Sequence, residues 1–309
     1  MSIDTIQRVN EALKGIVWGP PMLILIAGTG IYLSIGTGFI QAGKFGYMWK
    51  NTIKTLFKSD DSETETKSQN VTPFQAVTTA LAGTVGVGNV AGVAGAIVSG
   101  GPGALFWMWV SAFLGMAVKY AEIVLAVHFR QTAEDSAFYG GPMYYIEKGL
   151  NMKWLALLFS VFGGLCCFGI GNAVQSAEIA SAVNTLTASD ASVATGAVLA
   201  VITAVSVVGG IKRIAAITSL LVPIMALFYL LGSVVILGSN LSEIPAAFAL
   251  IFREAFSVNS AASGVSGYLL MNAVRYGFAR GVFSNEAGLG SSPIAHASAS
   301  AADPTIQGL

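Results

Sequence analysis

The sequence predicts an all-α integral membrane protein, and three observations carry this prediction. Hydrophobic residues make up 54% of the 309 residues and charged residues only 10%, whereas a soluble domain is typically about 25% charged. The mean hydropathy is +0.69. The charged residues are concentrated in a few places, and the apolar stretches between them approach the ~20 residues that a membrane helix needs. The net charge is zero, so nothing indicates binding to nucleic acid.

Seven apolar segments are the expected spans of the lipid bilayer. Between the first two lies a polar stretch, residues 58–70 (KSDDSETETKSQN), which predicts a solvated loop. The segment 241–256 is shorter and carries Glu243, Arg253 and Glu254, so it is expected to be an interfacial or re-entrant helix. The expected spans are residues 16–35, 72–98, 104–128, 154–183, 193–209, 215–237 and 263–283.

The distribution of lysine and arginine predicts how the chain is oriented. Short loops rich in these residues stay in the cytoplasm, and three such loops fall on one side when the spans alternate. They follow the first, third and fifth spans, with Lys44 and Lys50 in the first and Lys212 and Arg213 in the last. We therefore expect a multi-pass protein of a prokaryotic cell membrane with its N-terminus outside.

The middle of the second expected span is the strongest candidate for a binding site. Residues 83–89 read GTVGVGN, and each glycine costs a helix interior about 1 kcal/mol relative to alanine. A break in a membrane helix is tolerated where it lines a cavity. Its carbonyls can then bind a cation, and the next half-helix presents amides, here of Val87 and Gly88, to a carboxylate. Thr84 and Asn89 offer oxygens to the cation. The alternative is a close-packed helix with a face of small residues.

Two polar side chains in the fourth segment are further candidates. Asn172 and Gln175 lie three residues apart, on nearly the same face of a helix. Amides at this depth usually face the interior of the bundle, where they either join helices or contact a ligand. His128 and His296 are far apart, and Cys166 and Cys167 point in different directions on a helix. We therefore expect no metal site, and no pair of catalytic groups predicts an enzyme.

Three stretches resemble the alanine or glycine:cation symporter family, which includes the sodium:alanine symporters. Residues 100–115 (GGPGALFWMWVSAFLG) are similar to the signature of that family. Residues 74–94 (FQAVTTALAGTVGVGNVAGVA) resemble its first core helix, and residues 281–293 (GVFSNEAGLGSSP) resemble its sixth. The element GIGNAVQ, which contains Asn172 and Gln175, has a counterpart whose glutamine approaches the substrate. The similarity runs along nearly the whole chain.

The resemblance implies the leucine-transporter fold, which has two inverted five-helix repeats with discontinuous first and sixth core helices. Residues 1–70 would form an extra N-terminal helix and a cytoplasmic loop. Residues 71–240 would form the first repeat, and residues 241–309 the interfacial helix and the sixth core helix. Because the fold needs ten core helices, we expect that the chain is truncated and that this fragment alone does not transport.

The resemblance also implies the site residues and the function. Val87, Gly88, Gln175, Asn172, Phe283 and Ser284 would bind a small amino acid, alanine or glycine, and Phe283 would close a short pocket. Thr84, Asn89 and Asn285 would bind sodium as the coupling ion, although Asn285 could equally be a helix cap. The expected function is symport by alternating access.

The sequence is also compatible with two other functions. A proton-coupled carrier, with Glu178 or Glu122 as the titratable group, and an inactive membrane fragment are the alternatives. Glu122 is also expected to form an ion pair with Lys119. Arg280 is expected to reach the cytoplasmic surface. The oligomeric state cannot be predicted.

Overall fold

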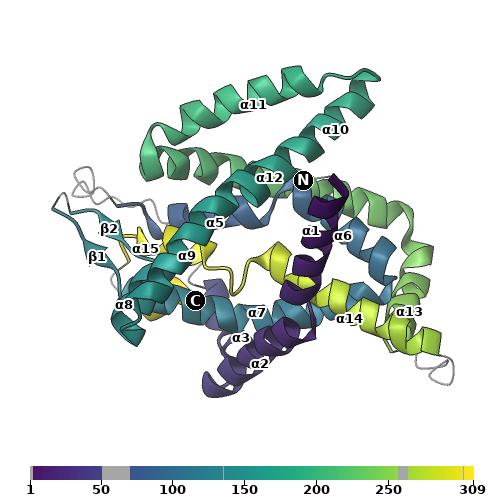
Figure 1. Cartoon of the computed structure of the whole chain (residues 1–309), viewed down its shortest axis with the longest axis horizontal. Helices are drawn as coiled ribbons and strands as arrows, with labels where there is room; N and C mark the ends of the chain where they lie inside the picture. Colours follow the sequence, from purple (N-terminus) through teal and green to yellow (C-terminus); the bar gives the residue numbers. More distant parts are fainter. Residues whose placement is uncertain (1–2, 51–69, 135, 257–263, 302) are drawn as a thin grey trace. The chain divides into compact units, whose positions relative to one another are not determined.

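The computed structural model describes residues 3–50, 70–134, 136–256, 264–301 and 303–309, and its secondary structure is almost entirely helical (Figure 1). Most of the predicted polar loop, residues 58–69, lies outside the described residues. The chain divides into two compact units. The first unit comprises Met1–Gly43, Gly92–Val118 and Ile236–Gly288, and the second comprises Lys44–Ala91, Lys119–Val235 and Leu289–Leu309.

The first unit is built around the start of one long helix. Its elements are α1 (Ile3–Val17), α2 (Pro20–Gly36), α3 (Ile40–Gly43), most of α6 (Val87–Gly100), the first part of α7 (Gly103–His128), the short 3-10 helix η3 (Leu241–Glu243), α13 (Ile244–Ala255) and α14 (Gly264–Asn285). Aromatic rings fasten α13 to α7. The Trp107 indole donates to the carbonyl of Ala255 over 3.2 Å, and the Phe106 and Phe256 rings meet edge to face with centroids 4.8 Å apart.

The second unit contains the remaining elements. They are α5 (Pro73–Thr84), the rest of α7, β1 (Gln131–Thr132), β2 (Phe138–Tyr139), α8 (Pro142–Leu150), α9 (Lys153–Cys166), the π-helix η2 (Cys167–Val174), α10 (Gln175–Thr187), α11 (Ser192–Val207), most of α12 (Gly210–Ser239), α15 (Ser291–Ala297) and α16 (Pro304–Gly308). The two strands are antiparallel, and Gln131 pairs with Tyr139. Helix α15 packs on α5 and on β2.

Local chemistry fixes where α5 begins. Thr72 is its N-cap, and its hydroxyl accepts a hydrogen bond from the backbone of Gln75 over 3.2 Å. The Gln75 side chain accepts one in return from the backbone of Thr72 over 3.0 Å, which completes a capping box. Pro73 occupies the first turn, where the missing N–H has no helical partner to lose. The start of the broken span is therefore firmly set.

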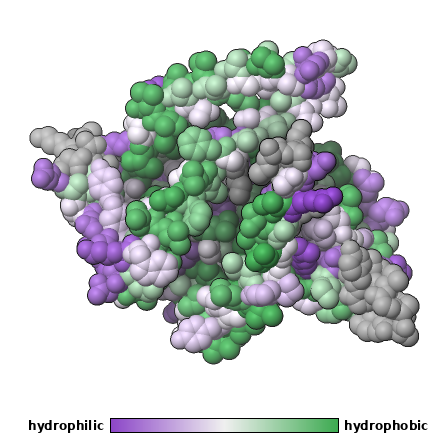
Figure 2. Space-filling view, viewed as in Figure 1, coloured by the Kyte–Doolittle hydropathy of each residue, from purple (hydrophilic) through white to green (hydrophobic). Residues whose placement is uncertain are grey.

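Several helices have the length and composition of membrane spans. Among the described residues, four helical stretches qualify: Gln7–Gly36, Gly103–His128, Lys153–Thr187 and Gly210–Ser239. The bent pair α5 and α6 makes a fifth. Apolar side chains such as Phe228, which is 81% exposed, face outward from them, and Figure 2 shows hydrophobic residues over much of the visible face. The prediction of an all-α, multi-pass membrane protein is thus confirmed, because soluble proteins rarely expose so much apolar surface.

The other two expected spans are helical but fall short of these criteria. Helix α11 has only 16 residues, and α14 is less apolar than the others, with Asn272 and Arg275 along its length. Three features were not anticipated: the β1–β2 hairpin, helix α8, and the short helix α16 in the polar C-terminal stretch.

Candidate functional site

The second expected span is broken in its middle, as the glycine-rich sequence predicts. Helix α5 ends at Thr84, and α6 begins at Val87 after a bend of 43°. Between them, Val85 leaves the helical region with φ −111° and ψ 76°. The alternative of one continuous close-packed helix is therefore wrong. The break exposes the first backbone amides of α6, which have no partners within their own helix.

The side chain of Gln175 binds to the start of α6. The backbone N–H of Gly88 donates to Oε1 of Gln175 over 3.1 Å, and Gly88 is buried. A Cβ atom on Gly86 would lie only 3.0 Å from Nε2 of Gln175, and one on Gly88 would lie 3.2 Å from the same atom. Both glycines therefore admit the amide to the helix terminus. The structure brings Gly88 and Gln175 together, and it adds Gly86, which was not among the predicted site residues.

Thr84 and Asn89 meet across the same break. The side-chain amide of Asn89 donates to the backbone carbonyl of Thr84. The Thr84 hydroxyl donates back into α5, to the carbonyl of Leu81 over 3.2 Å. Two oxygen-bearing groups thus lie in contact where helical hydrogen bonding stops. Such hard oxygen donors suit an alkali cation better than a soft metal.

Gln175 is presented by an unusual stretch of helix. The GIGN element forms the π-helix η2, which spans Cys167–Val174 between α9 and α10. Its i→i+5 hydrogen bonding widens the turn, and such segments occur often at functional sites. Asn172 is exposed, and its side chain donates to the carbonyl of Cys167 over 3.0 Å. The structure therefore gives Asn172 a partner in its own helix, and only Gln175 is seen at the α6 terminus.

A second interruption separates α14 from α15, in the segment that resembles the sixth core helix. Helix α14 ends at Asn285, and α15 starts at Ser291. Three residues of the connection have positive φ: Glu286 (55°), Gly288 (83°) and Gly290 (78°). The side chain of Asn285 accepts a hydrogen bond from the N–H of Ala287 over 2.9 Å. Asn285 therefore caps this turn, as one of its two predicted roles requires.

Ser284 and Asn285 line a hollow of about 260 Å³ within the first unit. Its other lining residues come from α6, α7 and α14: Val93, Leu105, Met108, Trp109, Ala112 and Gly281. Nδ2 of Asn285 lies close to α7, because a Cβ on Gly115 would be 2.9 Å from it. The hollow is mostly apolar, with its polar groups on α14.

Phe283 and Arg280 form a pair on α14. The Arg280 guanidinium lies 4.9 Å from the centroid of the Phe283 ring, a distance typical of a cation–π contact. It also lies directly over Gly92 of α6, where a Cβ atom would overlap it. Nε of Arg280 is buried. The absence of a side chain on Gly92 leaves room for the guanidinium between α6 and α14. That Arg280 reaches the cytoplasmic surface stays a prediction.

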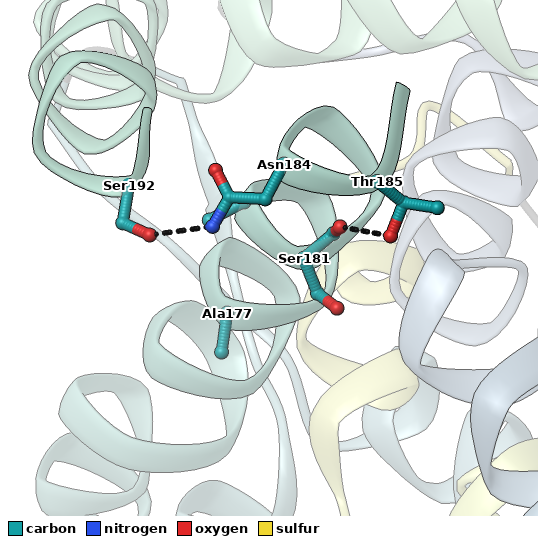
Figure 3. Close-up of a pocket in the computed structure, with 6 residues that line it drawn as sticks. Ala177, Ser181, Asn184, Thr185 and Ser192 are labelled. Atoms are coloured by element: carbon teal, nitrogen blue, oxygen red, sulfur yellow. Dashed lines mark hydrogen bonds between the residues drawn. The ribbon is translucent and has the colours of Figure 1, made fainter. Parts of the chain in front are cut away.

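Another hollow, of about 600 Å³, lies at the ends of α10 and α11. Figure 3 shows Asn184 and Ser192 pointing toward each other, and their side chains are hydrogen-bonded over 2.8 Å. Hydrogen bonds from the Ser192 side chain and backbone lower the pKa of Asp190 in the connecting turn. The lining consists of alanines and small polar residues, and it includes none of the predicted site residues.

Comparisons with known proteins support the resemblance. The sodium:alanine symporter family matches residues 3–309. A sodium/alanine symporter of Methanococcus maripaludis, AgcS, is 46% identical over 99% of this chain and 66% of its own length. An uncharacterized transporter of Haemophilus influenzae is 44% identical over 99% of this chain and 65% of its own length.

A probable sodium/glutamine symporter of Bacillus subtilis, GlnT, is 36% identical over 98% of this chain and 62% of its own length. The chain therefore spans about two thirds, or slightly less, of the length of these curated relatives.

Proposed function

Because the chain belongs to the sodium:alanine symporter family, a family of transporters and not of enzymes, we propose that it serves in symport of a small amino acid with sodium. Alanine and glycine are the proposed substrates. The proposed setting is a prokaryotic cell membrane, with the N-terminus outside. The proposed mechanism is alternating access.

The hydrogen bond between Gly88 and Gln175 is the observation that carries this proposal. Oε1 of Gln175 accepts from the first turn of α6, where the helix dipole favours negative charge. The carboxylate of an amino acid presents the same kind of acceptor, so the α6 amides of Val87 and Gly88 can bind it there. The NH₂ group of Gln175 can donate a further hydrogen bond to an oxygen of the carboxylate.

The two interrupted helices favour an inverted-repeat fold of the leucine-transporter type. The first interruption lies between α5 and α6, and the second lies between α14 and α15. Transporters of this type form their substrate site at broken helices.

Sodium is the proposed coupling ion. Thr84 and Asn89 place oxygen donors at one break, and Asn285 lies at the other. An ion held at the first break by Thr84 and Asn89 would stabilise the broken geometry that exposes the α6 amides, so the ion and the amino acid would each raise the affinity for the other. Ser284 and Phe283 would contribute to the amino-acid pocket. Asn172 would help to hold the shape of η2, which precedes Gln175.

Uptake into proteoliposomes tests the proposal. The full-length protein should accumulate radiolabelled alanine or glycine when a sodium gradient is applied, and not when choline replaces sodium. Uptake that ignores sodium but follows an inward proton gradient would instead favour proton coupling through Glu122 or Glu178. Absence of both uptake and alanine binding would refute the carrier function.

A further inference from the structure

We propose that Arg130 is a positioning residue for transport, because it clamps the backbone after α15 to the start of α5 so that both half-helices move as one body. The proposal rests on the proposed transport function. The clamp consists of Arg130, the strands β1 and β2 with Ser136, Asn70 and Val71, and residues 298–301. All of it lies within the second unit.

Arg130 binds two carbonyl groups beyond α15. Its Nη1 donates to the carbonyl of Ala299 over 2.7 Å, and its Nη2 donates to that of Ala301 over 2.9 Å. Its guanidinium also lies 3.8 Å from the centroid of the Phe138 ring on β2. The planar fork of arginine suits this double contact, and lysine could supply only a point charge. One side chain at the end of α7 thus fixes the segment 299–301 against the hairpin.

The same segment is hydrogen-bonded to Val71, which lies two residues before α5. Val71 and Ala299 form a parallel β-bridge, in which Val71 N–H donates to the Ser298 carbonyl over 3.1 Å and Ser300 N–H donates to the Val71 carbonyl over 2.8 Å. Val71 is 2% exposed and Ala299 0%. Two connections that are far apart in the sequence are therefore joined in a buried contact.

Asn70 ties this contact to the hairpin. Its Oδ1 accepts from the N–H of Phe138 over 2.7 Å, and its Nδ2 donates to the carbonyl of Ser136 over 3.1 Å. The strands β1 and β2 and helix α15 lie side by side (Figure 1). The residues before α5 are therefore bonded both to the hairpin and to the segment after α15.

The position of the clamp gives it a role in transport. It holds one end of α5, and the other end of that helix carries Thr84 and the break at which Gln175 binds Gly88. A continuous helix of 12 residues transmits a displacement of one end to the other. Because α15 packs directly on α5, the clamp ensures that neither half-helix shifts without the other.

A reversible cross-link tests whether the clamp stays closed during transport. Cys166 and Cys167 are first replaced by serine, and Val71→Cys and Ala299→Cys are then introduced. Bridged strands lie about 4.8 Å apart, within the ~4.4–6.8 Å between Cα atoms that a disulfide spans. Sodium-driven alanine uptake should be the same with the pair oxidised or reduced. Loss of uptake on oxidation, restored by a reductant, would overturn the proposal.

Substitution of Arg130 tests its part in the clamp. Arg130→Gln should lower the maximal uptake rate about tenfold, while alanine affinity measured by binding changes less than twofold. Oxidation of the 71–299 cysteine pair in the Arg130→Gln protein should restore uptake, since the disulfide replaces the lost contact. Unchanged uptake in Arg130→Gln, or failure of the disulfide to restore it, would contradict the proposal.

Two controls separate this proposal from the proposed function. Arg253→Gln removes another arginine, whose side chain is 72% exposed and pairs with the neighbouring Glu254, and it should leave uptake unchanged. If Arg130→Gln does not fold, the 71–299 cross-link in a protein that retains Arg130 still tests whether the clamp stays closed during transport. If the reduced cysteine pair with native Arg130 shows no sodium-driven uptake and no alanine binding, the proposed function fails, and not merely the clamp.

Discussion

The amide oxygen of Gln175 accepts a hydrogen bond from the backbone of Gly88, 87 residues earlier in the chain, over 3.1 Å. This contact joins the first residue of α10, which follows the π-helix η2, to the break between α5 and α6. It puts a neutral acceptor at a helix terminus that favours anions.

Replacing Gln175 should weaken amino-acid binding. Gln175→Leu removes the acceptor for the Gly88 N–H and the polar contact to the substrate, and we expect alanine affinity to fall about tenfold or more. Gln175→Glu should be more harmful, because its carboxylate would occupy the α6 terminus and repel that of the substrate. Equilibrium binding of radiolabelled alanine measures both. Ser181→Ala, an exposed change on the same helix α10, is the control and should bind normally.

Adding even a methyl group at Gly86 should weaken amino-acid binding. A Cβ atom there would stand 3.0 Å from Gln175 Nε2, so Gly86→Ala must push the amide away from the break. We expect alanine affinity to fall several-fold while the protein still folds. Gly196→Ala on α11, where nothing lies within 4 Å of the added atom, is the matched control. Equal affinities for the two variants in a binding assay would argue against Gln175 as a contact of the substrate.

Replacing Asn89 should weaken the binding of sodium more than the binding of the amino acid. Asn89→Ala removes the side chain that holds the Thr84 carbonyl and one oxygen donor at the break. We expect the sodium concentration for half-maximal alanine binding to rise about tenfold, with alanine affinity at saturating sodium nearly restored. A titration of sodium at fixed alanine measures this. A uniform loss of binding at every sodium concentration would assign Asn89 to the amino-acid pocket or to folding.

Asn285→Asp separates the two roles predicted for Asn285. Aspartate can still accept the hydrogen bond from Ala287 N–H, so a residue that serves only as a cap predicts unchanged folding and unchanged sodium dependence. A residue that also binds sodium predicts an altered sodium requirement, because the added negative charge attracts the cation. Asn285→Ala, in contrast, should destabilise the turn by about 1 kcal/mol. Thermal unfolding and the sodium titration together distinguish these outcomes.

Gly92→Ala should displace Arg280. The new methyl group would overlap the guanidinium, which must then leave its place beside Phe283. We expect a loss of stability of about 1–3 kcal/mol, seen as a lower temperature of unfolding in detergent. Gly95→Ala, on the same helix and with nothing within 4 Å of its Cβ, should unfold like the unmodified protein. A shift of the same size in both variants would show that α6 merely tolerates substitution poorly.

The first interruption could be predicted from the sequence because its cause is local, and the second was implied by the resemblance of residues 281–293 to a discontinuous helix. Three glycines within residues 83–88 disfavour a helix in a span that is otherwise apolar, and Gly288 and Gly290 supply the left-handed backbone of the second break. The apolar runs likewise predicted the membrane spans. These features depend on residues close together in the sequence, and so does the capping box of Thr72 and Gln75.

The long-range contacts could not be predicted, because they depend on partners that a single sequence does not reveal. Arg130 binds carbonyls 169 and 171 residues away, and two-residue strands show no alternation of polar and apolar side chains. The contact of Arg280 on α14 with Gly92 on α6 likewise joins residues far apart in the sequence. The spacing of Asn172 and Gln175 was judged on an α-helix, whereas the chain there forms the π-helix η2.

This π-helix makes the number of residues before Gln175 a determinant of the site. Each residue advances an α-helix by about 100°, so deletion of one residue within 167–174 would rotate everything that follows by roughly that angle. The carboxamide would then turn away from the break although every side chain that contacts Gly88 was still present. Length variation in this stretch should therefore be less tolerated than substitution, which a series of single-residue deletions and insertions would reveal.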